Sequence, residues 1–141
     1  MGGTGVMESK VKEYLSQEEL KGKAHFTGWI PHDELPKYLN ELRLLVLHSS
    51  TEGLPNIVLE AMACGCPVLA SDKTSLPEVG GDAVQYFDPV DSDVMAVVLH
   101  EVLSDENLRK KLSRKGYDRV EEFRWSAIIP RMEQLYSDQL Q

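Results

Sequence analysis

The sequence predicts an α/β fold in which a parallel β-sheet carries helices on both faces. Two observations predict it. Short apolar runs of strand length alternate with segments of helical period along most of the chain, and alternation over ten to fifteen residues is typical of βαβ units. The run RLLVLHSS at 43–50 is nearly continuous in apolar side chains, which suits a strand covered on both sides.

The first third of the chain predicts two helices and two strands. Residues 6–15 place apolar side chains at helical intervals, and AHFTG at 24–28 is a short apolar segment ending in glycine, which predicts a strand and its turn. Residues 30–42 put several apolar side chains on one helical face after His32 and Asp33, and the strand at 43–50 follows.

The middle of the chain predicts a helix between two further strands. The helix begins near Pro55, a residue favoured in the first turn, and ends at Gly65, the usual left-handed stop. Short apolar runs at 67–71 and 83–89 predict the third and fourth strands.

Residues 91–141 are expected to form the C-terminal helices, the last of them capped by Ser126, with Pro130 close to that cap. We expect one domain, residues 1–141. A domain of this kind normally opens on a strand, whereas this chain opens on the glycine-rich MGGTG. The expectation is therefore an N-terminally truncated domain that lacks its first βαβ segment.

Composition limits the classes of partner. The 141 residues are 42% apolar, enough for a real core, and 15 basic against 23 acidic residues give a formal net charge of -8. Such a balance argues against general affinity for nucleic acid or an anionic membrane. The sequence has no apolar run of about eighteen residues and its start is not apolar. We expect a cytoplasmic protein, with peripheral membrane attachment of a full-length form left open.

Cysteine and histidine give no metal-binding pattern. Cys64 and Cys66 have a single residue between them, an awkward geometry for a disulfide, and we interpret them as buried packing thiols. The four histidines are scattered along the chain. We therefore predict no metal site.

Two carboxylates mark the candidate functional site. Glu52 and Glu60 have seven residues between them, so on one continuous helix they would lie about 12 Å apart along the axis, too far for a close pair. Pro55 instead lets the helix begin there, which leaves Glu52 in the preceding loop. Between the carboxylates lies a helix N-terminus, which favours an anion. Its amides are expected to have no partner within the helix: Leu54, Asn56, Ile57 and Val58.

Carboxylates on both sides of an anion site suit a nucleoside diphosphate sugar. Such a ligand has ribose hydroxyls, a diphosphate and sugar hydroxyls in that order. The stretch HSSTEGLPNIVLEAMACGCPVLAS at 48–71 resembles the donor-site signature of the glycosyl transferases group 1 family, retaining enzymes with the GT-B architecture. FTGWIPHDELPKYL, LPEVGGDAVQYFDPVD and EEFRWSAIIPRMEQLY resemble three further family segments. The resemblance implies a Rossmann-like, donor-binding C-terminal half of a GT-B fold.

By that resemblance Glu60 would bind the ribose hydroxyls, and Glu52, the candidate catalytic residue, would bind donor-sugar hydroxyls or face the positive charge developing at the anomeric carbon. The segment cradling the distal phosphate and sugar would be Gly53, Leu54, Pro55, Asn56, Ile57 and Val58. Gly28, Trp29 and Ile30 would meet the edge of the base. A glycine loop near the nucleotide would comprise Gly2, Gly3 and Gly5.

The resemblance implies transfer of a hexose from a UDP-, GDP- or ADP-sugar to an acceptor hydroxyl with retained anomeric configuration, without cofactor or metal. The acceptor, a sugar or a lipid, and the catalytic histidine would belong to an N-terminal domain, so the isolated chain is expected to be inactive and prone to self-association. The family's basic pair lies upstream, and 44–72 contains no Lys or Arg. Lys73 is a candidate helper, and Glu78 is either solvated or beside the sugar phosphate.

Two other functions stay open at this point. One is a GT-B epimerase that handles a nucleotide sugar. The other is a non-catalytic degenerate domain that keeps the fold and acts in assembly, and such a module need not bind nucleotide.

Overall fold

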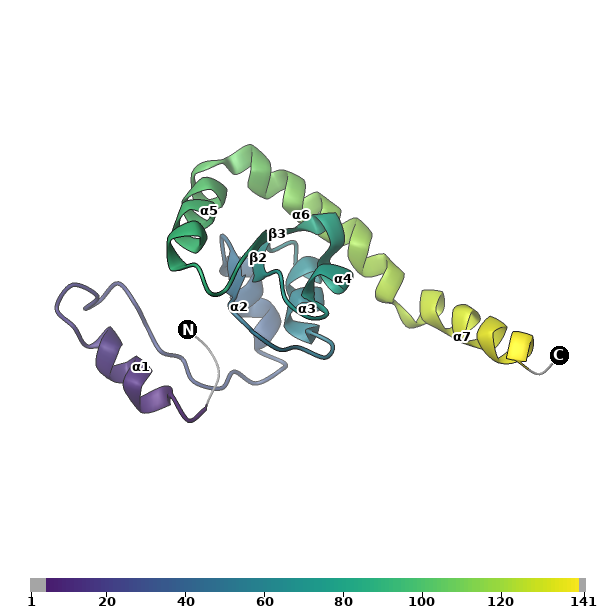
Figure 1. Ribbon diagram of the computed structural model, residues 1–141, viewed down its shortest axis with the longest axis horizontal. Helices are drawn as coiled ribbons and strands as arrows, with labels where there is room; N and C mark the ends of the chain where they lie inside the picture. The colour runs from purple at the N-terminus through teal and green to yellow at the C-terminus, as the bar shows by residue number, and fades with distance from the viewer. Residues whose placement is uncertain (1–4, 140–141) are drawn as a thin grey trace. The chain divides into compact units, whose positions relative to one another are not determined.

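The computed structural model describes residues 5–139, which form seven α-helices, two 3₁₀-helices and three strands (Figure 1). The chain divides into two compact units, Met1–Leu35 and Pro36–Gln141. The extent of a single domain over 1–141 stays a prediction. Gly2 and Gly3 lie outside the described residues.

The first unit contains one helix and an extended segment. Helix α1 spans Glu8–Leu15, as its apolar period predicts, and Lys12 lies 4.9 Å from the centroid of the Phe26 ring. The predicted strand at 24–28 is wrong, because only Gly28 forms an isolated bridge. Ala24 and Phe26 are only half-buried, so this short run lacks the burial and ladder that distinguish a strand from an extended loop. The turn itself is present, since Gly28 has φ of 69°.

The second unit is built on a parallel sheet with strand order β1-β2-β3. Strands β1 (Leu45–Leu47), β2 (Val68–Ser71) and β3 (Val84–Phe87) fall on the apolar runs that predict them. Leu45 pairs with Val68, and Val68 with Val84. The predicted α/β class with a parallel sheet is confirmed.

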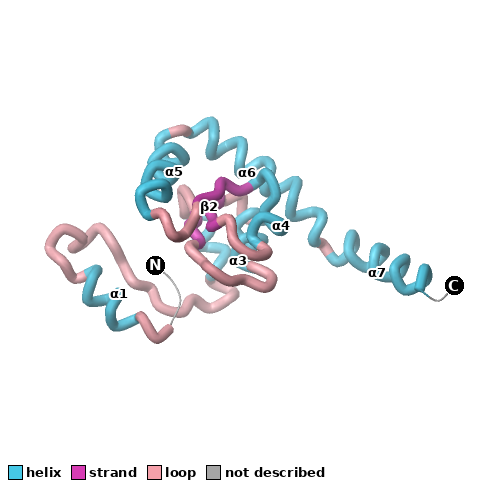
Figure 2. Tube along the Cα trace, in the orientation of Figure 1, coloured by secondary structure: helices cyan, strands magenta, loops and turns pink. Residues whose placement is uncertain are grey.

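Several helices lie around the strands of this unit, whereas α7 extends away from them (Figure 2). Asp91 and Asp105 cap α5 and α6, each accepting two backbone N–H bonds at the helix start, which satisfies donors that have no partner within a helix. The bounds of the helices are α2 Leu35–Glu41, α3 Asn56–Ala63, α4 Leu76–Gly80, α5 Ser92–Ser104, α6 Glu106–Val120 and α7 Trp125–Gln139, with 3₁₀-helices η1 Gly81–Ala83 and η2 Glu121–Phe123.

The core lies around the central strand. All four residues of β2 are buried, because β2 has a strand on each side and helix α3 packs against it. Helix α3 contributes three residues at most 1% exposed, Val58, Ala61 and Met62. Their i, i+3, i+4 spacing is the helical period that turns one face of α3 inward.

Helices α3 and α6 pack closely through Gly116. A Cβ placed on Gly116 would lie 3.1 Å from Cγ and 3.2 Å from Cβ of Met62. These distances are shorter than ordinary carbon contacts. Glycine at this position therefore sets how near α6 approaches the helix that carries Glu60.

The last helix departs from the sequence prediction at its start. Ser126 is not its cap: α7 begins at Trp125, and the Arg124 carbonyl accepts from the amides of Ala127 and Ile128. Helix α7 buries none of its residues, and it leaves Trp125, Ile129 and Met132 among its exposed apolar side chains. Among residues 5–139, no helix has the length and apolarity needed to cross a membrane.

Candidate functional site

The candidate site lies on the loops that leave the carboxyl ends of the strands. In open α/β sheets ligands bind at this edge. The loops are joined there by hydrogen bonds: Ser71 Oγ, at the end of β2, donates to the Ser49 carbonyl after β1, and His48 Nε2 lies 3.0 Å from the Pro89 carbonyl after β3. The loop that carries Glu52 is therefore tied to both neighbouring loops.

The backbone of Glu52 is held on both sides by the loop after β2. Its N–H donates to Thr74 Oγ1 at 3.0 Å, and its carbonyl accepts from Ser75 Oγ at 3.1 Å. Two bonds to one peptide segment restrict its dihedral angles. The half-buried Glu52 side chain is therefore carried by a backbone segment of restricted conformation.

Thr74 adopts an unusual backbone conformation at this contact. Its φ is 52°, and no other non-glycine residue within 5–139 has positive φ. A β-branched residue in the left-handed region costs of order 1–3 kcal/mol and tends to occur at functional sites. The hydroxyl that holds Glu52 is thus carried by a strained residue.

The first turn of α3 offers fewer free amides than the sequence predicts. The Asn56 amide donates to the Leu54 carbonyl and the Val58 amide to the Pro55 carbonyl, both at 2.9 Å, so neither is available to an anion as it stands. The amides without a hydrogen-bond acceptor, within the part of the chain described, are those of Gly53, Leu54 and Ile57. The amides of Asn56 and Val58 are occupied because the chain forms a tight turn around Pro55 before the helix begins.

Glu60 lies on α3 away from the core face. Residues 58, 61 and 62 point into the core, whereas Glu60 is half-buried and shares its side of the helix with Asn56 and Ile57 through i+4 and i+3 spacing. The structure thus keeps the predicted order of loop carboxylate, helix N-terminus and helix carboxylate.

A cleft of about 350 Å³ borders this loop and supplies cations that sequence reasoning missed. Gly53 and Leu54 line it together with Arg119 and Arg131. Arg119 is already engaged, donating to the Val79 and Glu78 carbonyls and pairing with a glutamate. Arg131, an exposed residue of α7, has no ion-pair partner among residues 5–139.

Lys73 is placed differently from the expected phosphate helper. Its Nζ lies 2.8 Å from a carboxylate oxygen of Asp72 and 3.4 Å from one of Asp88. The hydrogen bond to Asp72 raises the pKa of Lys73, and the backbone N–H of Val90, followed by Lys73, lowers the pKa of Asp88. Two carboxylates therefore offset this lysine's charge.

The remaining candidate residues are one glutamate and the two cysteines. Glu78 is exposed and lines the cleft beside Gly53. Cys66 is buried, and burial raises the pKa of its thiol to about 11, whereas Cys64 is only half-buried, so the expectation of two buried thiols holds for one. No group of three or more metal-binding side chains forms within residues 5–139.

The turn proposed to meet the base belongs to the first unit. Trp29 is 69% exposed and follows Gly28, while Ile30 is half-buried.

Comparison with known proteins identifies the family. The profile described as Glycosyl transferases group 1 matches residues 1–119. O-antigen chain mannosyltransferase B of Escherichia coli is 36% identical over 124 residues, 88% of this chain and 32% of that protein. A 2-deoxystreptamine N-acetyl-D-glucosaminyltransferase of Streptomyces fradiae is 29% identical over 84% of this chain and 31% of its own length. The chain thus spans about one third of these curated relatives.

Solved structures agree in fold. Sucrose-phosphate synthase of Thermosynechococcus elongatus superposes with a TM-score of 0.79 at 29% identity, covering 96% of this chain and 35% of that one. The C-terminal domain of the group 1 glycosyltransferase LpcC of Francisella tularensis gives 0.71 at 30% identity, covering 82% and 60%. HepE of Anabaena in complex with UDP, at 20% identity and a TM-score of 0.79, shares the fold over 97% of this chain and 40% of its own. The chain belongs to the glycosyl transferases group 1 family, and its architecture is that of the GT-B glycosyltransferases.

Proposed function

We propose that this chain is the donor-binding domain of a retaining glycosyltransferase that moves a hexose from a nucleoside diphosphate to an acceptor hydroxyl. The observation that carries the proposal is the braced loop after β1. It holds Glu52 through Thr74 and Ser75 and leads directly into the N-terminus of α3.

The parts of a nucleotide sugar match the groups at this edge of the sheet. The free amides of Gly53, Leu54 and Ile57 suit a phosphate, because amides at a helix N-terminus are aligned with the positive end of the dipole. Glu60 accepts hydrogen bonds from the ribose hydroxyls, and Glu52 accepts them from the sugar. An ionised carboxylate can only accept hydrogen bonds, so the hydroxyls donate to it.

Known relatives support a nucleotide-sugar donor. HepE of Anabaena has been solved in complex with UDP and with UDP-glucose, and TarM of Staphylococcus aureus in a complex that includes UDP. These proteins share the fold at 18 to 20% identity. The choice among UDP-, GDP- and ADP-sugars rests in our proposal on backbone groups beside Trp29.

Transfer with retention would use Glu52 beside the reacting centre. Departure of the diphosphate leaves positive charge at the anomeric carbon, and a nearby carboxylate stabilises that charge electrostatically. The acceptor hydroxyl would attack on the same face. Acceptor binding and proton removal belong in this proposal to another domain, so we expect no turnover from this chain alone, and metal is not required.

Affinity of the isolated chain is expected to be weak. The free amides contribute about 0.3–2 kcal/mol through the dipole, and among the described residues that line the cleft Arg131 is the cation without an ion-pair partner. Binding near 1 mM corresponds to about 4 kcal/mol. An added basic pair would tighten it, because a charge-assisted bond to phosphate is roughly twice as strong as a neutral one.

The test is a titration of the chain with UDP-glucose and GDP-mannose, followed by amide chemical shifts. Saturable shifts at Gly53, Leu54, Ile57 and the Trp29 turn are expected, with Glu101→Gln, an exposed glutamate on α5, as an unaffected control. Saturable binding that leaves those amides unmoved would refute the site. No binding at about ten times the expected Kd would favour a non-catalytic module.

A further inference from the structure

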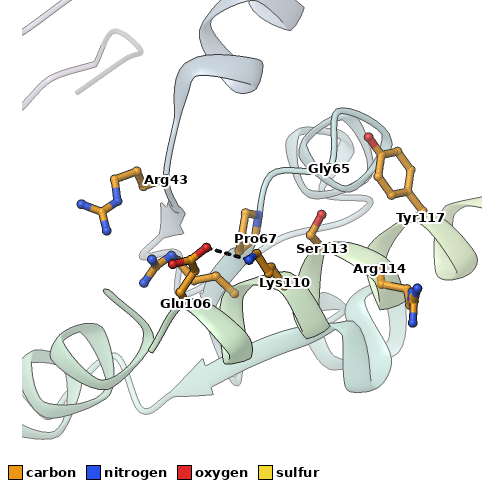
Figure 3. A pocket seen from close by; sticks show the side chains of 9 residues that line it. Arg43, Gly65, Pro67, Glu106, Lys110, Ser113, Arg114 and Tyr117 are labelled. Atoms are coloured by element: carbon orange, nitrogen blue, oxygen red, sulfur yellow. Dashed lines mark ion pairs between the residues drawn. The ribbon is translucent and has the colours of Figure 1, made fainter. Parts of the chain in front are cut away.

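A second depression lies at the opposite edge of the sheet from the donor loops (Figure 3). Its volume is about 440 Å³. Arg43 precedes β1, Gly65 and Pro67 precede β2, and the remaining wall is helix α6. Strands of three or four residues at about 3.3 Å each put the two edges roughly 10 Å apart. The depression, called the basic groove below, is thus separate from the proposed donor site.

The basic groove concentrates positive charge in an acidic chain. Arg43, Arg109, Lys110 and Arg114 line it, and Glu106 is its one carboxylate. Four positive charges and one negative charge leave a local net charge of +3, whereas the whole chain carries -8. Figure 3 shows the Glu106–Lys110 ion pair, 2.7 Å long, between Arg43 on one side and Arg114 on the other.

Two of these cations stand outside the Glu106–Lys110 ion pair. Arg43 and Arg114 are exposed and have no ion-pair partner among residues 5–139. Lys110 and Arg114 stand at i and i+4 on α6, where like charges repel. An anion placed between these side chains would remove that repulsion.

The other polar groups are arranged to hold the cations in place. Arg109 Nη1 donates to the Val102 carbonyl at 2.8 Å and to the Leu103 carbonyl. These neutral acceptors hold the guanidinium in place without cancelling its positive charge. Lys110, first by its hydrogen bond, and then Arg109 and Arg43 lower the pKa of Glu106. Their positive fields therefore converge on the groove.

A solvated helix face is the plainer interpretation of basic residues on α6. It does not account for Arg43, which comes from a different element. The hydroxyls of Ser113 and Tyr117, on α6 itself, complete the lining. Guanidinium groups match phosphate oxygens with paired donors, and hydroxyls add further ones. In Figure 3 the guanidinium groups of Arg43 and Arg114 point outward. Exposed side chains change rotamer within nanoseconds, so both can turn inward on binding.

We propose that the basic groove binds a phosphate group, carried either by a soluble phosphate monoester or by a lipid headgroup. This inference stands apart from the proposed donor function, because it uses none of the donor-loop residues.

The experiment titrates the full chain with sodium phosphate against sodium chloride of equal ionic strength and follows amide shifts. Saturable shifts confined to Gly65, Ser113 and Arg114 are expected with phosphate. The double variant Arg43→Gln/Arg114→Gln should bind at least about tenfold more weakly. Lys111→Gln, which removes one charge from the same helix outside the groove, should change affinity less than about twofold. Circular dichroism checks that each variant is folded.

A second arm separates the two sources of phosphate. Co-sedimentation with phosphatidylglycerol vesicles, set against phosphatidylcholine vesicles, identifies a headgroup if retention disappears in the double variant. Saturable phosphate shifts without vesicle retention identify a soluble ester. Equal responses to phosphate and chloride, or the same loss in Lys111→Gln as in the double variant, would overturn the proposal. So would vesicle retention that the double variant leaves unchanged.

Discussion

Replacement of Glu60 by glutamine tests the donor site most directly. Glu60 is half-buried on the side of α3 away from Val58 and Met62. Hydrogen bonds to a charged group contribute about 1.5–3 kcal/mol net, and glutamine keeps one acceptor oxygen while losing the charge. We expect a loss of roughly 1–3 kcal/mol in nucleoside diphosphate binding, which is roughly 5- to 150-fold in Kd. Glutamine has nearly the same shape, so unfolding free energy should change by less than about 1 kcal/mol.

Calorimetry with UDP and with 2′-deoxy-UDP on both proteins isolates the ribose contact. The deoxy ligand should bind more weakly than UDP to the natural chain and nearly as well as UDP to the Glu60→Gln variant, because the two changes remove one interaction. Glu101→Gln serves as the matched control. Equal UDP affinities for the natural chain and the variant, or an equal deoxy penalty in both, would refute the assignment of Glu60 to the ribose.

Four further outcomes are expected. Thr74→Val removes the hydroxyl that holds the Glu52 backbone, and should weaken UDP-glucose binding by about 0.5–1.5 kcal/mol more than UDP binding, measured by calorimetry; equal losses would contradict this brace. Arg131→Gln should weaken UDP binding and flatten its salt dependence, whereas Arg124→Gln should not, as a titration at two ionic strengths would show. At pH 8, iodoacetamide should modify Cys64 first, because a thiol pKa of about 11 leaves about one Cys66 in a thousand as thiolate; mass spectrometry showing equal modification of the folded chain would be inconsistent. The isolated chain should self-associate with concentration through exposed apolar surface on α7, and sedimentation of a clean monomer at high concentration would argue against it.

Local patterns predicted most of the second unit. The strands fall on apolar runs, although only β2 is buried along its whole length while β1 is half-buried. Helix α3 begins and ends where Pro55 and Gly65 indicate, with Gly65 at φ of 70°. The predicted strand at 24–28 failed because an apolar run of that length is also compatible with an extended loop. Ser126 failed as a cap because the helix begins at Trp125, so Ser126 already lies within its first turn. Shifts of one or two residues are usual at helix ends.

The parts of the site that sequence did not predict depend on long-range contacts. Thr74 and Ser75 hold Glu52 across more than twenty residues, and Arg131 reaches the cleft from the last helix. The one available signal was local: hydroxyl residues in the loop after a strand and before Leu-Pro favour a turn or cap. Which backbone group those hydroxyls bind follows only from the register of the parallel sheet.

The close approach at Gly116 couples the position of α6 to that of α3, the helix that begins at the proposed donor site, although α6 itself would not touch the donor. An added methyl group there must displace Met62 or push the two helices apart by a few tenths of an ångström. Met62 and Glu60 stand on one rigid helix, so the displacement would also move Glu60, the carboxylate that we propose binds the ribose. In an unbiased screen for weakened nucleotide binding, this side-chain-free position on a helix of otherwise mostly polar residues should therefore be recovered alongside residues that touch the ligand.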